Sequence, residues 1–157
     1  MKKRGNQIVY SPSDLVTFLA SPFASWMDRY YLENPDAVTP DPRSEDLILI
    51  AETGNEHEAN ILTEMKTAVP GLVEISMQDP LAFEKTQATI AARAPIIYQA
   101  KLASGVFEGY SDFLQLDQTG EYVVWDTKVA RSPKPYYAIQ LCCYSEMLAG
   151  TCNTALP

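Results

Sequence analysis

The chain has 157 residues, of which 46% are hydrophobic and 20% are charged, a composition typical of one globular domain of ordinary size. Its net charge of −8 has the wrong sign for a protein that holds nucleic acid by bulk electrostatic attraction. No run approaches the roughly 18 continuous apolar residues of a membrane helix, and no apolar segment follows the basic start to make a signal peptide. An odd number of cysteines, with Cys142 and Cys143 adjacent, argues against a disulfide framework, so we expect a cytoplasmic protein.

The N-terminal third is predicted to be helical. Either Ser13 or Asp14 can serve as the N-cap of a first helix, and Pro22 is expected to break it. A second aromatic stripe continues beyond the proline, followed by a loop rich in Pro and Asp over 34–46. The residues that carry the helical spacing are Leu15, Phe18, Leu19, Trp26, Tyr30 and Tyr31.

A long helix is predicted over 46–69. Its broad apolar face comprises Leu47, Ile50, Ile61, Leu62 and Met65. Gly54 lies in the middle of this helix, where glycine costs roughly 1 kcal/mol relative to alanine. We therefore expect another backbone or a ligand to approach closely at Gly54.

The second half of the chain reads as strands between helices. A short strand is predicted over 72–76, followed by a helix over 80–94 that has Pro80 at its first position. Three further strands are predicted over 96–102, 106–117 and 121–128, with "DQTG" as the hairpin turn between the last two.

A final helix over 133–150 is predicted to end at Gly150 as its C-cap. The resulting fold class is mixed α/β (α+β), a mixed sheet flanked by helices. We divide the chain into an N-terminal helical segment and loop (1–45), a core (46–150) and a tail (151–157). A further strand is expected after the last helix, so we interpret the chain as truncated at its C-terminus.

Two aspartates lie on strands predicted to be hairpin partners. Because side chains alternate along a strand, Asp112 shares a face with Tyr110 and Leu114, and Asp126 shares one with Val124 and Lys128. Across the ladder the two carboxylates can approach, and they repel unless a cation or a proton lies between them. Hard oxygen ligands of this kind suit Mg²⁺ or Mn²⁺. The alternative is that both are solvated residues at strand ends.

Two helical features accompany the aspartates. The single histidine, His57, lies in "GNEHE" beside Glu56 and Glu58, and Gln140 and Tyr144 are spaced i and i+4 on one helix face. Each feature alone is weak, because a lone histidine is more often a satisfied or exposed residue than a ligand.

Taken in order, these blocks resemble the RecB-like branch of the PD-(D/E)XK nuclease superfamily. That branch shows a helical G-x-x-H type block, then G-x-x-D, D/E-x-K and Q-x-x-x-Y. The corresponding residues here are Gly54 and His57, Gly109 and Asp112, Asp126 and Lys128, and Gln140 and Tyr144. The resemblance implies a restriction-endonuclease-like core and a divalent-metal-dependent deoxyribonuclease that acts in DNA processing or repair. More specifically, it looks like the RecB-type nucleases found as an N-terminal domain ahead of a helicase or an RNase H-like domain.

The resemblance also implies roles for individual residues. His57, Asp112, Asp126 and the Thr127 carbonyl would hold one or two Mg²⁺ or Mn²⁺ ions. Lys128 would orient or deprotonate the attacking water or stabilise the charge on the phosphate, and Gln140 and Tyr144 would position Lys128 or the nucleic-acid strand. Arg131 and Lys134 would contact phosphates, although a solvated loop is an equally good interpretation of both.

Several alternatives remain open at this stage. Glu58 is about 100° around the helix from His57, so one of the two should face the site, and the family pattern favours His57. No cysteine precedes Cys142, so we expect no iron–sulfur cluster. We expect DNA rather than RNA as the partner. The rival interpretation is a catalytically inactive domain with a nuclease-like fold that binds nucleic acid or a protein.

Overall fold

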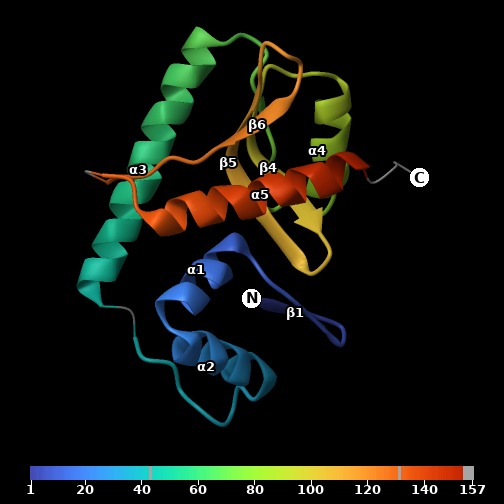
Figure 1. The fold of residues 1–157 in the computed structure, drawn as a ribbon. Coiled ribbons are helices and arrows are strands. Elements are labelled where there is room, and N and C mark those ends of the chain that lie inside the picture. Colours follow the sequence, from blue (N-terminus) through green and yellow to red (C-terminus); the bar gives the residue numbers. More distant parts are fainter. Residues whose placement is uncertain (43, 131, 154–157) are drawn as a thin grey trace.

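The structure is a computed structural model that describes residues 1–42, 44–130 and 132–153. Within these residues the chain forms a mixed α/β fold, with a four-stranded mixed sheet and five helices (Figure 1). The helices are α1 (Pro12–Ala20), α2 (Pro22–Glu33), α3 (Glu45–Ala68), α4 (Ala82–Ala91) and α5 (Pro135–Asn153). The strands are β1 (Lys2–Arg4), β2 (Gln7–Val9), β3 (Val73–Glu74), β4 (Ile96–Ser104), β5 (Phe107–Leu116) and β6 (Tyr122–Trp125).

The central sheet has the strand order β3-β4-β5-β6. β3 is parallel to β4, whereas β4, β5 and β6 form an antiparallel meander. The predicted mixed sheet is thereby confirmed, including the hairpin between β5 and β6. However, β6 ends at Trp125 rather than at Lys128, so Asp126, Thr127 and Lys128 lie beyond the paired strand. The chain thus leaves the ladder directly before Asp126.

The core lies between the sheet and helix α5, which crosses it (Figure 1). Ile97, Leu102 and Leu114 of the sheet pack with Met147 and Leu148 of α5. Gly150 was predicted to cap this helix, but α5 continues to Asn153. A Cβ atom at Gly150 would lie only 2.6 Å from the Cβ atom of Ser104, so glycine permits α5 to approach the end of β4. The prediction of a C-cap was therefore wrong.

The N-terminal segment begins with a β1–β2 hairpin that the sequence analysis did not anticipate. Ser11, rather than Ser13 or Asp14, is the N-cap of α1. Its side chain accepts a hydrogen bond from the Asp14 backbone N–H, and its own N–H donates to the Asp14 carboxylate at 2.7 Å. This reciprocal capping box leaves Pro12 at the first turn, where its missing N–H costs nothing. Helix α1 then packs on α5 and on α2.

Ser21 joins α1 to α2 without a loop. Its backbone N–H donates to Thr17 O at 2.9 Å and ends α1, while its side chain accepts from the Ala24 N–H at 3.1 Å and begins α2. Pro22, predicted to break the first helix, thus also stands at the start of the second. Both functions follow from a fixed φ and a missing donor.

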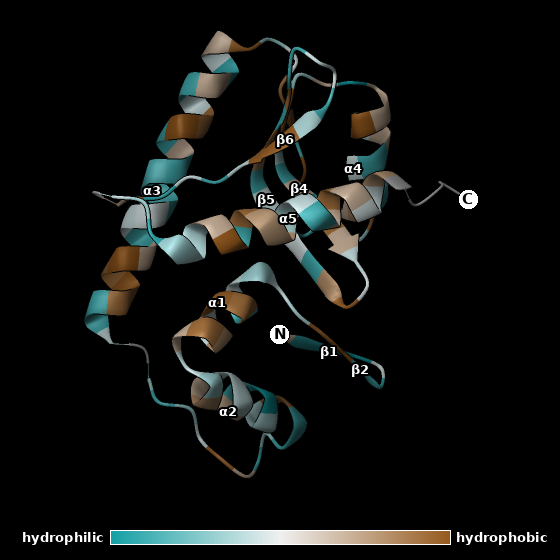
Figure 2. Cartoon of the chain, viewed as in Figure 1, coloured by the Kyte–Doolittle hydropathy of each residue, from teal (hydrophilic) through white to brown (hydrophobic). Residues whose placement is uncertain are grey.

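Helix α3 runs along one side of the fold and contains no buried side chain (Figure 1). Residues 47–50 are between 44% and 67% exposed, and Figure 2 shows them as a brown band near the start of the helix. A Cβ atom built on Gly54 meets nothing within 4 Å, so the predicted approach of another backbone was wrong, while the approach of a ligand stays a prediction. Helix α4 begins at Ala82 after Leu81, and not with Pro80 at its first position. None of the helices in the described residues has the length and apolar character needed to cross a bilayer.

Candidate functional site

Asp112 and Asp126 come together at the end of the β5–β6 ladder. The last pair before β6 ends is Phe113 opposite Trp125, so the register puts Asp126 next to Asp112. The Asp126 side chain is only 3% exposed. Burial, and after it the neighbouring Asp112 carboxylate, raise the pKa of Asp126, and the opposing effect of Lys128 is smaller than their sum. The predicted approach of the two carboxylates is confirmed.

Each aspartate has its own hydrogen-bond partner in the segment that follows β6. The Lys128 Nζ atom lies 2.6 Å from the Asp126 carboxylate. One oxygen of Asp112 accepts from the Thr127 backbone N–H at 2.8 Å and from the Thr127 hydroxyl at 3.1 Å. Thr127 therefore orients Asp112 through donors, while the predicted role of its carbonyl as a metal ligand stays a prediction.

Helix α5 packs against strand β5 next to the site. The Tyr144 hydroxyl donates to the Tyr110 carbonyl oxygen at 2.7 Å, and Tyr144 is 8% exposed. Burial and the two nearby carboxylates raise the pKa of this phenol, while a hydrogen bond with Gln140 opposes the rise. The expected pairing of Gln140 and Tyr144 on one helix face is thus confirmed. The Tyr144 ring is buried and its hydroxyl is engaged, and its predicted role in positioning Lys128 or the nucleic-acid strand stays a prediction.

Gly109 allows this close packing. A Cβ atom at this position would lie 3.3 Å from a Tyr144 ring carbon and 3.1 Å from Pro12 Cδ. Such contacts are tighter than most side chains tolerate, so a glycine lets α5 and the start of α1 meet β5 at one point. The glycine of the G-x-x-D block therefore has a packing role three residues before Asp112.

Helix α3 turns Glu58, and not His57, toward the sheet. The Gln99 side-chain amide donates a hydrogen bond to the Glu58 carboxylate. Burial and the Glu58 carboxylate together raise the pKa of Tyr98 to about 12. In the described part of the chain, no three side chains of His, Cys, Asp or Glu come close enough to share a metal ion. His57 therefore does not join Asp112 and Asp126, and its predicted convergence with them was wrong. Because consecutive helical residues point about 100° apart, orienting Glu58 to the sheet turns His57 aside.

Gln99 has an unusual backbone beside the candidate site. Its φ is +55°, although it lies within strand β4. The pairs on either side of it, Tyr98 with Phe113 and Ala100 with Ser111, put Gln99 opposite Asp112 in the register. A left-handed residue other than glycine costs roughly 1–3 kcal/mol and is concentrated at functional sites. Sequence reasoning missed Gln99, because nothing in the pattern of an apolar strand reveals a positive φ.

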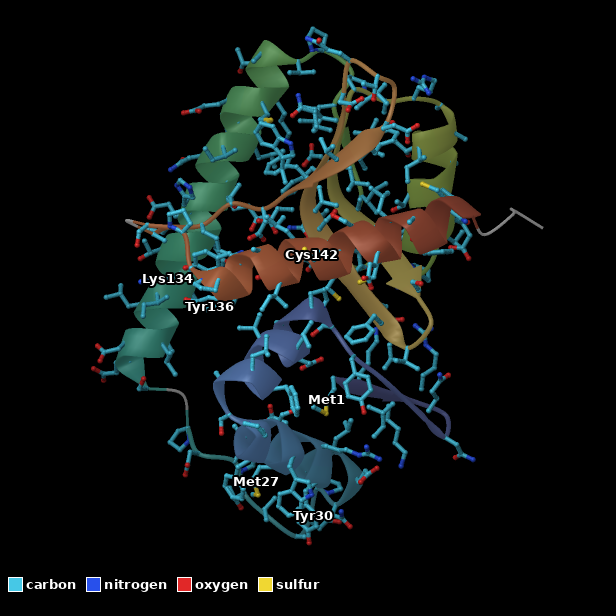
Figure 3. The ribbon with its side chains drawn as sticks, viewed as in Figure 1. Met1, Met27, Tyr30, Lys134, Tyr136 and Cys142 are labelled. Carbon is cyan, nitrogen blue, oxygen red and sulfur yellow. The ribbon has the colours of Figure 1, made fainter. Side chains whose placement is uncertain are left out.

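The predicted phosphate contacts lie further along the chain. Lys134 is exposed just before α5, where Figure 3 shows it beside Tyr136, and its role stays a prediction. Arg131 lies outside the described residues. Tyr137 in the first turn of α5 is close enough to Asp126 for that carboxylate to add to the raised pKa of its phenol, whose first cause is a hydrogen bond with Tyr136.

The donor set fits a hard divalent cation. Asp112 and Asp126 offer carboxylate oxygens at one point, and Mg²⁺ is commonly bound through one or two carboxylates with water completing its shell. A cation between the two carboxylates relieves the repulsion that raises the pKa of Asp126. The chemistry of the pair thus suits Mg²⁺ or Mn²⁺ without a histidine ligand.

No family model, no curated protein sequence and no solved structure matches this chain.

Proposed function

We propose that the chain is the core of a metal-dependent nuclease that hydrolyses phosphodiester bonds in DNA, with a RecB-like, restriction-endonuclease-like arrangement. The observation that carries the proposal is the meeting of Asp112 and Asp126 beyond β6, with Lys128 bound to Asp126. Helix α5, with Gln140 and Tyr144, supports the same point of the sheet from behind. A downstream helicase or RNase H-like domain remains part of the proposal by resemblance alone.

The roles of the residues follow from their surroundings. Asp112 and Asp126 would hold Mg²⁺ or Mn²⁺, which supplies charge neutralisation at the phosphate and a more acidic water. Thr127 keeps one oxygen of Asp112 fixed through two hydrogen bonds. Lys128, 33% exposed, has its ammonium at the edge of the pair, where it can donate to a phosphate oxygen or to the attacking water. Tyr144 is a positioning residue that keeps β5 at a constant distance from α5.

A cleavage assay with matched variants tests the proposal. The protein is incubated with linear and circular DNA, single- and double-stranded, in Mn²⁺, Mg²⁺ or EDTA. We expect cation-dependent cleavage that falls at least a hundredfold in Asp126→Ala and in Lys128→Ala, the range found when a charge-stabilising group is removed from a site of this kind. Asp36→Ala is the control, because Asp36 is an exposed aspartate of the loop before α3. Cleavage that persists equally in all variants would show that the activity belongs to another site or to a contaminant.

The second candidate is a domain of similar fold that binds nucleic acid without cutting it. The observation that favours it is that the described residues supply two clustered carboxylates and no third metal-ligating side chain. Retained binding with no cleavage under any cation would select this alternative.

A further inference from the structure

An exposed row of aromatic rings runs along the N-terminal helices. We call Phe18, Phe23, Trp26 and Tyr30 the aromatic wall. On α2 the ring centroids of Phe23 and Trp26 are 6.1 Å apart and those of Trp26 and Tyr30 are 5.3 Å apart, with interplanar angles of 25° and 21°. Phe23 is 69% and Trp26 is 55% exposed. Figure 3 shows Tyr30 on the side of α2 away from α5. Stacked rings left open to solvent require an explanation, since large apolar side chains otherwise seek the core.

A cavity opens beside this row. It has a volume of about 340 Å³, and Phe18 and Trp26 line it together with Arg29, Tyr10 and Phe107. Its size falls in the range of pockets that take small planar molecules. Arg29 brings a guanidinium group to this lining, although it also pairs with Glu33 at 3.3 Å. The lining also contains Asp14, whose carboxylate pairs with the N-terminal ammonium of Met1. The lining thus combines ring faces with a cation, the two features that bind unpaired bases.

The charge of the chain is unevenly distributed between its N-terminal segment and the remainder. Residues 1–33 have four basic and three acidic side chains, a net charge of +1, so the remaining residues carry −9 of the total of −8. Lys2 and Arg4 pair with Glu108 and are still 57% and 63% exposed. The excess of negative charge therefore lies outside residues 1–33, in the remainder of the chain.

The wall is also fixed with respect to the candidate site. Helix α1 packs on α5 and on α2, and Pro12 meets the point where Gly109 and Tyr144 touch. The contact of Tyr144 with β5 near Asp112 is therefore connected to the helices that carry the aromatic wall.

We propose that the aromatic wall binds the unpaired bases of single-stranded DNA by stacking, and so delivers a single strand to the candidate site. The proposal rests on the proposed function for its second half, the delivery to a nuclease centre. Its first half, stacking on Trp26 and Phe23, needs no cleavage. Duplex DNA presents its base faces only at its ends, so the wall selects single strands.

Binding without a metal tests the wall separately from catalysis. The probe is a fluorescent thymidine oligonucleotide of about 16 nucleotides, the upper end of the site size of small single-strand-binding folds, measured by anisotropy in EDTA. An oligomer of equal length with abasic sugars carries the same phosphates but nothing to stack. We expect the abasic oligomer and a duplex to bind at least tenfold more weakly than the thymidine strand. Trp26→Ala and Phe23→Ala should each weaken binding of the thymidine strand about tenfold.

The control variant is Leu49→Ala on α3, which removes an apolar side chain that is 62% exposed and lies outside the wall. It should bind like the unaltered chain. Phe23→Ala keeps the test valid if Trp26→Ala fails to fold, because the Phe23 ring is largely in solvent. Three results would overturn the proposal that the aromatic wall binds unpaired bases. They are equal binding of the thymidine and abasic strands, unchanged binding in both wall variants, and no binding at all. Stacking-dependent binding without any cleavage would overturn the nuclease proposal and leave the wall standing.

Discussion

The pairing of Asp126 with Lys128 shows how a short segment keeps charges next to a core. Asp126 is 3% exposed and its carboxylate is bound by Lys128 on one side and faces Asp112 on the other. One ammonium cannot neutralise two carboxylates, so the pair retains a net negative charge when both are ionised. This arrangement is poor for stability alone and good for receiving a cation.

That imbalance gives a stability prediction. Asp126→Asn should raise the thermal midpoint in EDTA at neutral pH by roughly 2–4 °C, the shift caused by about 1 kcal/mol in a chain of this size. The folded state raises the pKa of Asp126, so it binds the proton more tightly than the unfolded chain, and stability is lost as pH rises above 3.8. An amide does not titrate, so the variant does not lose this stability. Scanning calorimetry at pH 7 and below pH 3.8 measures the thermal midpoints of the two proteins, and the difference between them should be absent at the lower pH.

Added Mn²⁺ should reverse the order of the two proteins. Binding to the native state alone raises the midpoint of the unaltered chain, whereas Asp126→Asn lacks half of the site and should not respond. Asp36→Asn, which changes an exposed loop residue, is the control and should follow the unaltered chain in both conditions. An equal response to Mn²⁺ in all three proteins would contradict a site at Asp126.

At the scale of elements, two helical glycines differ in the space around their Cα atoms. Gly54 in α3 has open space where a Cβ atom would stand, whereas at Gly150 in α5 that atom would collide with Ser104. The sequence alone treats both as weak points or ends of helices. Only the packing of α5 on β4 distinguishes them.

Alanine at the two glycines should therefore have effects of opposite sign. Gly54→Ala should stabilise the protein by about 0.5–1 kcal/mol, because alanine restricts the unfolded chain and suits a helix interior. Gly150→Ala should destabilise it by roughly 1–3 kcal/mol, the usual cost of forcing extra volume into a packed contact. Denaturant titration of the two variants measures both. A loss of stability in Gly54→Ala would mean that something does approach α3 at that point.

Element types were largely predictable, and their ends were not. The helical spacing in α1, α2 and α3 and the alternation in β5 identified these segments, because apolar side chains recur every three to four residues in a helix and every two in a strand. The β1–β2 hairpin was missed, since Lys2, Lys3 and Arg4 give no apolar alternation. Two of them, Lys2 and Arg4, pair with Glu108 of a distant strand. The early end of β6 was missed because Asp126 continues the alternation of the strand although it has lost its partner strand.

At the scale of the whole molecule, Glu108 ties the N-terminal hairpin to the central sheet. This β5 residue is 7% exposed and pairs with both Lys2 and Arg4 of β1. Burial favours its neutral form, but the ion pair with Lys2, helped by Arg4 and Lys101, outweighs burial and lowers the pKa of Glu108. The ionised Glu108 carboxylate thus adds to the backbone hydrogen bonds that Tyr10 makes with Val106 and Glu108.

Acid should therefore weaken this link. A lowered pKa gives stability that is present above 4.5, the ordinary value, and is lost as pH falls through the lower folded value. Glu108→Gln should lower the thermal midpoint at pH 7 by roughly 2–4 °C, and the difference should shrink below pH 4.5. Glu74→Gln, which breaks an exposed ion pair with Lys66, should have little effect at either pH. Equal shifts in both variants would show that Glu108 acts as a surface charge only.

The candidate site was predictable where it depends on local register and not where it depends on tertiary orientation. Counting residues across a hairpin was enough to bring Asp112 to Asp126, and a spacing of four was enough to pair Gln140 with Tyr144. Whether His57 or Glu58 faces the sheet depends on how α3 is rotated, which its pattern did not fix because its apolar residues are distributed around the helix. Gln99 depends on a backbone conformation that only the assembled sheet imposes.

The single-residue junction at Ser21 has a mechanical consequence. Because no loop separates α1 from α2, the change of direction between the two helices is made at one serine, which terminates the first and starts the second. The helix that carries Phe23, Trp26 and Tyr30 is therefore joined to the candidate site by direct contacts, from α2 to α1, from α1 to α5, and from Tyr144 of α5 to Tyr110 of β5.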